Sequence, residues 1–356
     1  MFSEMSRILD LIFLFLTFLS PFSLSFNIVG YMPEWRHEGA DFDRLSQHLT
    51  HLIFFSLEPT PKGDIIGQER IPRPELMKEA RQAATKHDTK LMICFGGNGR
   101  SGGFSVMVRN EKNRQTFLRN LAKLLDKYEL DGVDYNWEYP GYRMGRGYME
   151  EKEIMKDYEG LVALIKETKK MFQDRVVSVA YYPDTRQENL FHMFGVDRVV
   201  DLMYSMSYDQ GGPNHSSRDL AKQTIKQAKD AELPLDKVCV GLPFYGRDDR
   251  QGDWVTYEDL VQQNKLTGKE DEVTRNGAKV GFNGRNTISW KVKLAIKEKV
   301  GGVMIWEVGQ DCRVHPVTRG DSVHVKTCPQ GEDSSLLAAI TKVTKDLLPQ
   351  NTKEEL

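Results

Sequence analysis

The stretch that decides the fold is DGVDYNWEYP, residues 131–140. Side chains alternate along a β-strand, so Asp134, Asn136 and Glu138 share one face of this segment. A strand that is apolar on its other face and flanked by apolar runs is typical of a parallel sheet buried on both sides. Polar groups on a buried face are costly unless they pair or act. The segment therefore predicts a buried strand with a functional polar face at its C-terminal end.

Similar apolar runs recur along the chain. The segments that read as strands are 27–31, 51–57, 90–95, 132–137, 176–181, 199–208, 237–242 and 301–306. Helical patterns such as 74–87, 158–172 and 219–231 separate most of them, and this alternation predicts a parallel sheet covered by helices. Eight such units favour a closed (β/α)8 TIM barrel, an α/β fold. No glycine-rich dinucleotide fingerprint follows the first strand, which removes the usual indication of an open doubly wound sheet.

The predicted domain organisation is simple. Residues 26–348 form one barrel domain, and the polar stretch 247–285 between the seventh and eighth strands is too short for a large second domain. We expect a small, irregular excursion above the barrel there. Hydrophobic residues make up 40% of the 356, and the net charge is −2. This balance gives no indication of nucleic acid or an acidic membrane as a partner, so the binding site must be found in local motifs.

Both ends of the chain resemble targeting signals. Residues 8–18 are almost wholly apolar, Pro21 then ends the run, and small residues precede Phe26. This pattern predicts a cleaved signal peptide at 1–25 rather than a membrane anchor, which needs about 20 apolar residues, so no membrane span is expected in the mature chain. The tail 349–356 ends in KEEL, which is similar to the retrieval address of the endoplasmic reticulum. We expect a secreted protein or one kept in that lumen.

Four cysteines fit an oxidising compartment. Cys94 and Cys239 lie inside apolar strand-like runs and are expected to be buried free thiols. Cys312 and Cys328 flank one hydrophilic loop, where a disulfide is expected. No zinc-ligand spacing is present, and neither a metal nor another cofactor is expected.

The segment 131–140 resembles the fourth-strand signature of family-18 glycoside hydrolases, Asp-x-x-Asp-x-Asp-x-Glu followed by Tyr-Pro. Other pieces of that family's pattern occur in order and cover most of the mature chain. They are VGY at 29–31 with Trp35, CFGG at 94–97, MSYD at 206–209, GLPFYGR at 241–247 and GVMIW at 302–306. The resemblance implies a TIM barrel that binds an N-acetylglucosamine oligosaccharide or chitin. No appended chitin-binding module is evident.

The resemblance also implies a mechanism. Glu138 would protonate the glycosidic oxygen, and the substrate's own 2-acetamido carbonyl would act as the nucleophile, an exception to the two-carboxylate scheme. Configuration would be retained, and the cleaved sugar must carry an N-acetyl group. Asn136, Asp134 and Tyr208 complete the implied catalytic set, with Tyr208 bonding the acetamido oxygen.

The implied sugar-contacting residues come from several strands. Asp209 would support Tyr208, and Trp306 would form the floor under a sugar ring; for each aromatic residue the alternative is plain core packing. Trp35 is a further candidate for the same cleft. The full predicted binding set is Tyr31, Gly97, Tyr139, Met206, Asp209, Tyr245, Arg247 and Trp306.

One departure from the family pattern bears on activity. The family has Asp where this chain has Asn136, and that Asp offsets the positive charge of the oxazolinium ion formed from the substrate. An Asn still accepts an N–H bond but supplies no charge. The missing contact is expected to cost about 10² to 10³ in rate. Cys94 also stands where the family has Ser, which removes a hydroxyl near Asp134.

Three functions remain open from the sequence. The first is an active, slow hydrolase of β-1,4-linked N-acetylglucosamine, as in chitin or chitooligosaccharides. The second is a chitinase-like lectin, against which the retained Glu138 argues. The third is an endo-N-acetylglucosaminidase that acts on glycoprotein glycans, which the KEEL tail favours and the sequence around Trp137 does not.

Overall fold

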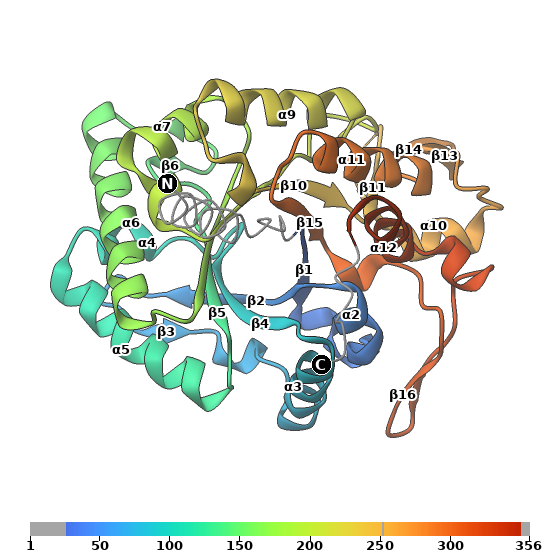
Figure 1. Ribbon diagram of the computed structural model, residues 1–356, viewed down its shortest axis with the longest axis horizontal. Helices are drawn as coiled ribbons and strands as arrows, with labels where there is room; N and C mark the ends of the chain where they lie inside the picture. The colour runs from blue at the N-terminus through green and yellow to red at the C-terminus, as the bar shows by residue number, and fades with distance from the viewer. Residues whose placement is uncertain (1–25, 251–252, 350–356) are drawn as a thin grey trace, which may run out of the picture.

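The computed structural model describes residues 26–250 and 253–349. Parallel strands form a closed barrel, because the first strand pairs with both the last and the second. Helices form a ring around it (Figure 1). In spatial order the barrel strands are β1 (Asn27–Pro33), β15 (Gly302–Trp306), β10 (Val238–Pro243), β9 (Leu202–Ser205), β8 (Val176–Tyr181), β5 (Gly132–Asn136), β4 (Lys90–Gly96) and β2 (His51–Pro59). The predicted (β/α)8 barrel is confirmed.

The helices that cover the barrel follow the strands in sequence. They are α2 (Phe42–His48), α3 (Pro74–His87), α4 (Phe104–Val108), α5 (Glu111–Lys127), α6 (Glu151–Met171), α7 (Arg186–Phe194), α8 (Val196–Val199), α9 (Arg218–Asp230), α11 (Arg285–Lys297) and α12 (Leu336–Leu347). A short 3-10 helix, η1 (Glu34–Gly39), follows β1. Apolar residues at helical spacing bury one face of each longer helix, as in α5, where Phe117, Leu121 and Leu125 are fully buried.

Two layers of core lie on the two sides of the barrel wall. The side chains of Tyr135 and Trp137 point toward the helices, and Trp137 stacks on Phe104 of α4 with ring centroids 5.2 Å apart. The intervening side chains of Asp134 and Asn136 are buried and point into the barrel. The predicted alternation along this strand therefore holds, and it presents the polar face to the interior.

The segment between β10 and α11 is more regular than we expected. Its strands β11 (Tyr245–Asp248), β12 (Trp254–Thr256), β13 (Glu272–Arg275) and β14 (Ala278–Gly281) form a four-stranded antiparallel sheet in the order β12-β11-β14-β13. Helix α10 (Tyr257–Gln263) packs in the same segment. The expectation of a small excursion holds. Its strands were not foreseen, because exposed strands such as β13 are polar at most positions and give little apolar signal. We call this sheet with α10 the insertion.

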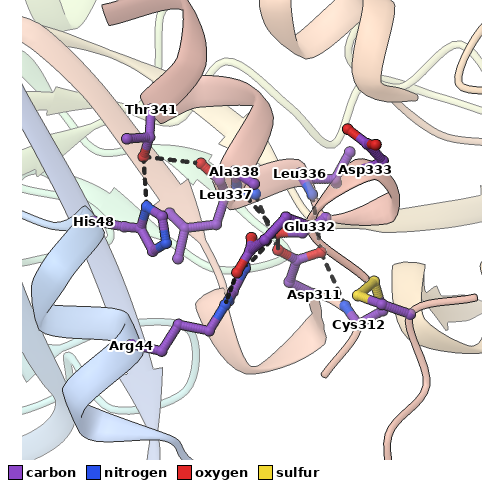
Figure 2. Close-up of polar contacts among 12 residues, drawn as sticks. Arg44, His48, Asp311, Cys312, Glu332, Asp333, Leu336, Leu337, Ala338 and Thr341 are labelled. Carbon is purple, nitrogen blue, oxygen red and sulfur yellow. Dashed lines mark hydrogen bonds and ion pairs between the residues drawn. A yellow bond between two sulfur atoms is a disulfide. The ribbon is translucent and has the colours of Figure 1, made fainter. Parts of the chain in front are cut away.

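The C-terminal helix is attached to the barrel by a buried carboxylate. Asp311 accepts hydrogen bonds from the Ser335 hydroxyl (2.6 Å) and from the backbone N–H groups of Leu336 and Leu337 (both 3.0 Å) at the start of α12 (Figure 2). An anion is favourable at a helix N-terminus. The adjoining Cys312 is bonded to Cys328, which confirms the predicted disulfide. The strands β16 (Val317–Arg319) and β17 (Ser322–His324) form a hairpin inside the loop that this bond closes.

Several other sequence predictions can be compared with the structure. Cys94 and Cys239 are buried free thiols, as predicted. Among residues 26–250 and 253–349, no helix has the length and apolarity needed to cross a membrane. The predicted signal peptide at 1–25 and nearly all of the predicted tail, 350–356, lie outside the described residues and stay predictions.

Candidate active site

A cavity of about 510 Å³ opens at the C-terminal ends of the barrel strands. This is the end at which TIM-barrel sites lie, and the volume lies within the range of ligand pockets. Nine of the predicted residues line it: Tyr31, Trp35, Asn136, Glu138, Tyr139, Met206, Tyr208, Asp209 and Trp306. The predicted residues Gly97, Asp134, Tyr245 and Arg247 are not among the residues that line the cavity.

Glu138 follows β5 and stands at the cavity wall. Burial raises the pKa of its carboxyl to about 7, the donor Asn136 lowers it, and the negative charge of Asp209 raises it. Its backbone N–H is fixed by the Ser101 hydroxyl at 3.1 Å. A carboxyl with a pKa near neutrality is suited to give and take a proton at physiological pH.

Asn136 adjoins Glu138 on the same face of the strand. Its side-chain amide lies close enough to Glu138 to lower the pKa of that carboxyl. The Oδ1 atom of Asn136 is buried and has no hydrogen-bond partner among the described residues. A buried acceptor without a partner is unfavourable. Asn136 is one of the residues that line the cavity.

Asp134 lies deeper in the barrel, fully buried below Asn136. Its carboxylate accepts hydrogen bonds from the hydroxyls of Tyr31 (2.7 Å) and Ser178 (2.8 Å). Burial raises its pKa to about 6, while donors including the Cys94 thiol lower it. The Cys94 thiol is thus a donor to Asp134 at the position where the family pattern has a Ser hydroxyl.

Asp209 is held at the cavity edge by groups of the insertion. Its Oδ1 accepts a hydrogen bond from the Tyr245 hydroxyl at 2.8 Å and pairs with Arg247 at 3.2 Å. The backbone φ of Asp209 is +61°, an unusual conformation for a residue other than glycine. Tyr208, beside it, is buried, and burial raises its pKa well above the usual value. Tyr245 and Arg247 therefore hold Asp209 rather than line the cavity themselves.

Aromatic rings form the bottom of the cavity. The ring centroid of Trp306 lies 4.7 Å from that of Phe55 and 5.6 Å from that of Tyr31. Gly97 permits this arrangement, since a Cβ atom there would lie 2.3 Å from the Phe55 ring. The glycine thus makes room for an aromatic residue that lines the site.

The sequence did not point to several lining residues. They include Phe55, Asn98, Arg100, Tyr182, Trp254, Glu307 and Gln310. Two ion pairs cross the mouth between loops far apart in sequence, Arg100 with Glu34 (2.6 Å) and Arg36 with Glu307 (2.8 Å). The residues of these two ion pairs show no local sequence pattern, and only the fold brings them together.

The arrangement combines one near-neutral acid with an amide acceptor and an apolar floor. These groups are suited to hold a sugar ring that carries an N-acetyl group and to exchange a proton with an oxygen next to it. In the described part of the chain, no cluster of three His, Cys, Asp or Glu residues is arranged to hold a metal ion.

Known proteins are similar to this chain in sequence and in fold. The chain is 24% identical over 329 residues to "Probable chitinase 2" of Drosophila melanogaster, covering 72% of this chain and 64% of that protein. It is 21% identical over 346 residues to "Class V chitinase CHIT5" of Lotus japonicus, covering 79% and 82%.

A solved structure of the Ostrinia furnacalis Group II chitinase catalytic domain 2, a mutant in complex with penta-N-acetylchitooctaose, (NAG)5, matches with a TM-score of 0.72. The match has 18% identity and covers 90% of this chain and 97% of that one. At this identity the likeness shows the fold. The family model "Glycosyl hydrolases family 18" matches residues 27–311. This chain therefore belongs to glycosyl hydrolase family 18.

Proposed function

We propose that this protein hydrolyses β-1,4-linked N-acetylglucosamine in chitin or chitooligosaccharides and retains the configuration of the cleaved sugar. Glu138 acts first as general acid and then as general base. The carbonyl oxygen of the substrate's 2-acetamido group attacks the anomeric carbon, the bond to the leaving sugar breaks, and water then opens the resulting oxazolinium ion. Family membership and the chitinase relatives support the substrate class.

The observation that carries the proposal is the pairing of two side chains at the cavity wall. The Glu138 carboxyl has a pKa of about 7, so that both its protonated and its ionised form are present near neutral pH. The adjacent Oδ1 of Asn136 is unpaired among the described residues and is suited to accept the acetamido N–H of the substrate. Glu138 thus protonates the glycosidic oxygen, while Asn136 orients the acetamido group that acts as the nucleophile.

Asp209 is not suited to replace that nucleophile. The hydroxyl of Tyr245 and the guanidinium of Arg247 already occupy its Oδ1. Burial also raises the pKa of Asp209. These contacts support a role in holding the acetamido group together with Tyr208, and they favour substrate assistance over a covalent bond to the protein.

A second function is favoured by Asn136 itself. An amide gives no negative charge to the oxazolinium ion, so the same cavity would bind chitooligosaccharides well and turn them over slowly. Such a protein would be a chitinase-like lectin. The retained Glu138 and its raised pKa support the hydrolase as the first proposal.

A digest separates these functions. We expect purified protein to convert chitotetraose to shorter oligomers, detected by mass spectrometry, and to leave a high-mannose glycopeptide intact. Binding of chitotetraose without product after long incubation would make the lectin the correct function. Cleavage of the glycopeptide alone would identify an endo-N-acetylglucosaminidase.

The disulfide bears on location. A bridge between Cys312 and Cys328 is typical of oxidising compartments, and it supports our proposal that the protein enters the secretory pathway.

A further inference from the structure

The loop between β9 and α9 contains a turn that presents one asparagine to solvent. Of its residues 213–216, only Asn214 is exposed, and its side-chain amide has no hydrogen-bond partner in the described part of the chain. The sequence Asn214-His215-Ser216 has the N-x-S pattern of an acceptor for N-linked oligosaccharides. It is the only N-x-S or N-x-T triplet among the 356 residues. The proposed hydrolysis gives this turn no role.

The residues on both sides of Asn214 are anchored in the fold. Pro213 packs against Gly281 of β14, where an added Cβ atom would lie 1.9 Å from the Pro213 carbonyl oxygen. His215 is fully buried, and its ring centroid lies 4.9 Å from that of Tyr245. These contacts fix the turn and leave the Asn214 side chain in solvent.

Ser216, the third residue of the triplet, is enclosed by the fold. Its hydroxyl donates to the carbonyl oxygen of Ser207 at 2.7 Å and accepts from Nζ of Lys291 at 2.7 Å. Lys291 is itself buried and donates also to Asn283. In the folded protein this hydroxyl is therefore fully occupied and out of reach of another protein.

A polar groove of about 810 Å³ lies beside the turn. Asn214 lines it together with charged side chains of both signs, among them Arg218, Asp271 and Lys279. No residue that lines this groove also lines the cavity at Glu138. A hydrophilic oligosaccharide on Asn214 would thus meet a polar surface and leave the cavity open.

We propose that Asn214 carries an N-linked oligosaccharide, which is attached before this part of the chain folds. The inference rests on the proposed entry into the secretory pathway, which the disulfide supports, and is independent of the proposed hydrolysis. The side-chain nitrogen of Asn214 forms a bond to the anomeric carbon of an N-acetylglucosamine residue and loses a proton. The bond from that carbon to the diphosphate of a polyprenyl-linked oligosaccharide donor breaks, and the diphosphate leaves with the electron pair.

The order of these events follows from the enclosure of Ser216. An acceptor triplet is defined by the hydroxyl of its third residue as well as by its asparagine. Once the chain has folded, that hydroxyl is bonded to Ser207 and Lys291. The transferase can therefore use the triplet only while this segment is unfolded.

The test is expression of the full chain in a eukaryotic cell, followed by release of N-linked sugars with peptide N-glycosidase in heavy-oxygen water. This treatment converts each glycosylated asparagine to a labelled aspartate, which peptide mass spectrometry locates. We expect the label at Asn214 alone. Asn214→Gln and Ser216→Ala should each lose it completely, whereas Ser216→Thr, which keeps the hydroxyl, should retain it.

Asn276→Gln is the matched control. Asn276 is also exposed in a turn, between β13 and β14, but Gly277 and Ala278 follow it, so its replacement should leave the label at Asn214 unchanged. Asn214→Gln should cleave chitotetraose at the wild-type rate, because the groove and the cavity share no residue. A slower Asn214→Gln would contradict the placement of the sugar outside the cavity.

A second measurement tests the order of attachment and folding. Folded, unglycosylated full chain and a peptide of residues 209–221 are each incubated with solubilised transferase and donor. The peptide should be glycosylated and the folded protein should not. Equal modification of both would overturn the order, and a peptide that accepts no sugar would overturn the site.

The state of the cysteines separates two ways in which the proposal can fail. An unlabelled Asn214 in protein with the Cys312–Cys328 bridge would overturn the glycosylation site alone, since that chain has passed through an oxidising compartment. An unlabelled Asn214 together with free thiols at Cys312 and Cys328 would overturn the site and also contradict entry into the secretory pathway.

Discussion

The side chains of Asn136 and Glu138 adjoin at the cavity wall, where the amide of Asn136 lowers the pKa of the Glu138 carboxyl and its Oδ1 has no hydrogen-bond partner among the described residues. An Asp at this position would need a shared proton to approach a second carboxylate. The amide needs none, and it holds one orientation in which it serves Glu138 and a substrate N–H together. The account of function depends on this pair.

The first prediction concerns the acid itself. Glu138→Gln keeps the shape of the side chain but removes the transferable proton, so turnover of chitotetraose should fall by at least about 10²-fold. Binding of chitotetraose, measured by calorimetry, should stay within a few-fold of the wild type. A variant that cleaves at the wild-type rate in a mass-spectrometric assay contradicts the assignment.

The second prediction restores the charge that the family pattern has. Asn136→Asp should raise the rate on chitotetraose by about 10² to 10³, because a carboxylate stabilises the oxazolinium ion. The pH dependence should also shift. The wild-type rate should fall as pH rises through about 7, where Glu138 loses its proton. A nearby negative charge raises the pKa of Glu138, so this limb should move to higher pH in the variant.

Tyr31→Phe is the comparison variant for the pH–rate profile of Asn136→Asp. It removes a hydroxyl donor of Asp134 without touching Asn136. An unchanged pH–rate profile in Asn136→Asp would show that the cavity is built around the amide and that charge at this position does not limit the rate.

Much of this site was predictable because a strand orders its side chains strictly. The alternation in segment 131–140 placed Asp134 and Asn136 in the interior, and the structure agrees. The parallel strands were equally easy to recognise as apolar runs in the sequence, because both of their faces are buried. Trp254 and Arg100 were not predictable. Trp254 reaches the cavity from β12 of the insertion and Arg100 from the loop after β4, and the place of Arg100 depends on its contact with Glu34, which no local pattern encodes.

The third prediction concerns stability in acid. Burial lowers the pKa of His51 to about 4, from an ordinary value near 6.5. Between these values the unfolded chain binds a proton that the folded chain does not, so stability is lost as pH falls from about 6.5 toward 4. The expected loss is on the order of 3 kcal/mol for this residue. Urea unfolding at neutral and acidic pH should show the decline, and His51→Gln should reduce it.

The stability of His51→Gln must be compared with that of the wild type at each pH, because other groups stabilise the folded state as pH falls. Burial raises the folded pKa values of Asp134 and Glu138 above their ordinary values. Those carboxyls favour the folded state as pH falls. An equal slope of stability against pH in His51→Gln and wild type would contradict the role given to His51.

The fourth prediction concerns the C-terminal helix. Replacing Cys312 and Cys328 together with serine opens a loop whose ends lie 16 positions apart in sequence. Loss of that closure should cost about 3 kcal/mol of unfolding free energy. Because Asp311 adjoins Cys312 and holds the start of α12, hydrogen exchange should increase first in that helix.

Reduction of the wild-type disulfide is the internal control for that experiment. Dithiothreitol should lower the melting temperature of the wild type to that of the double variant and leave the variant unchanged. The buried thiols of Cys94 and Cys239 are present in both proteins. A double variant as stable as the oxidised wild type would show that Asp311 alone holds α12.

The measurement that tests the central claim most directly is an NMR time course of chitotetraose hydrolysis that follows the anomeric protons of the first products. Glu138 acting with the substrate's acetamido group predicts that the new reducing ends appear as the β-anomer before mutarotation. New reducing ends that appear as the α-anomer would contradict this mechanism, as would the absence of any product when chitotetraose is bound.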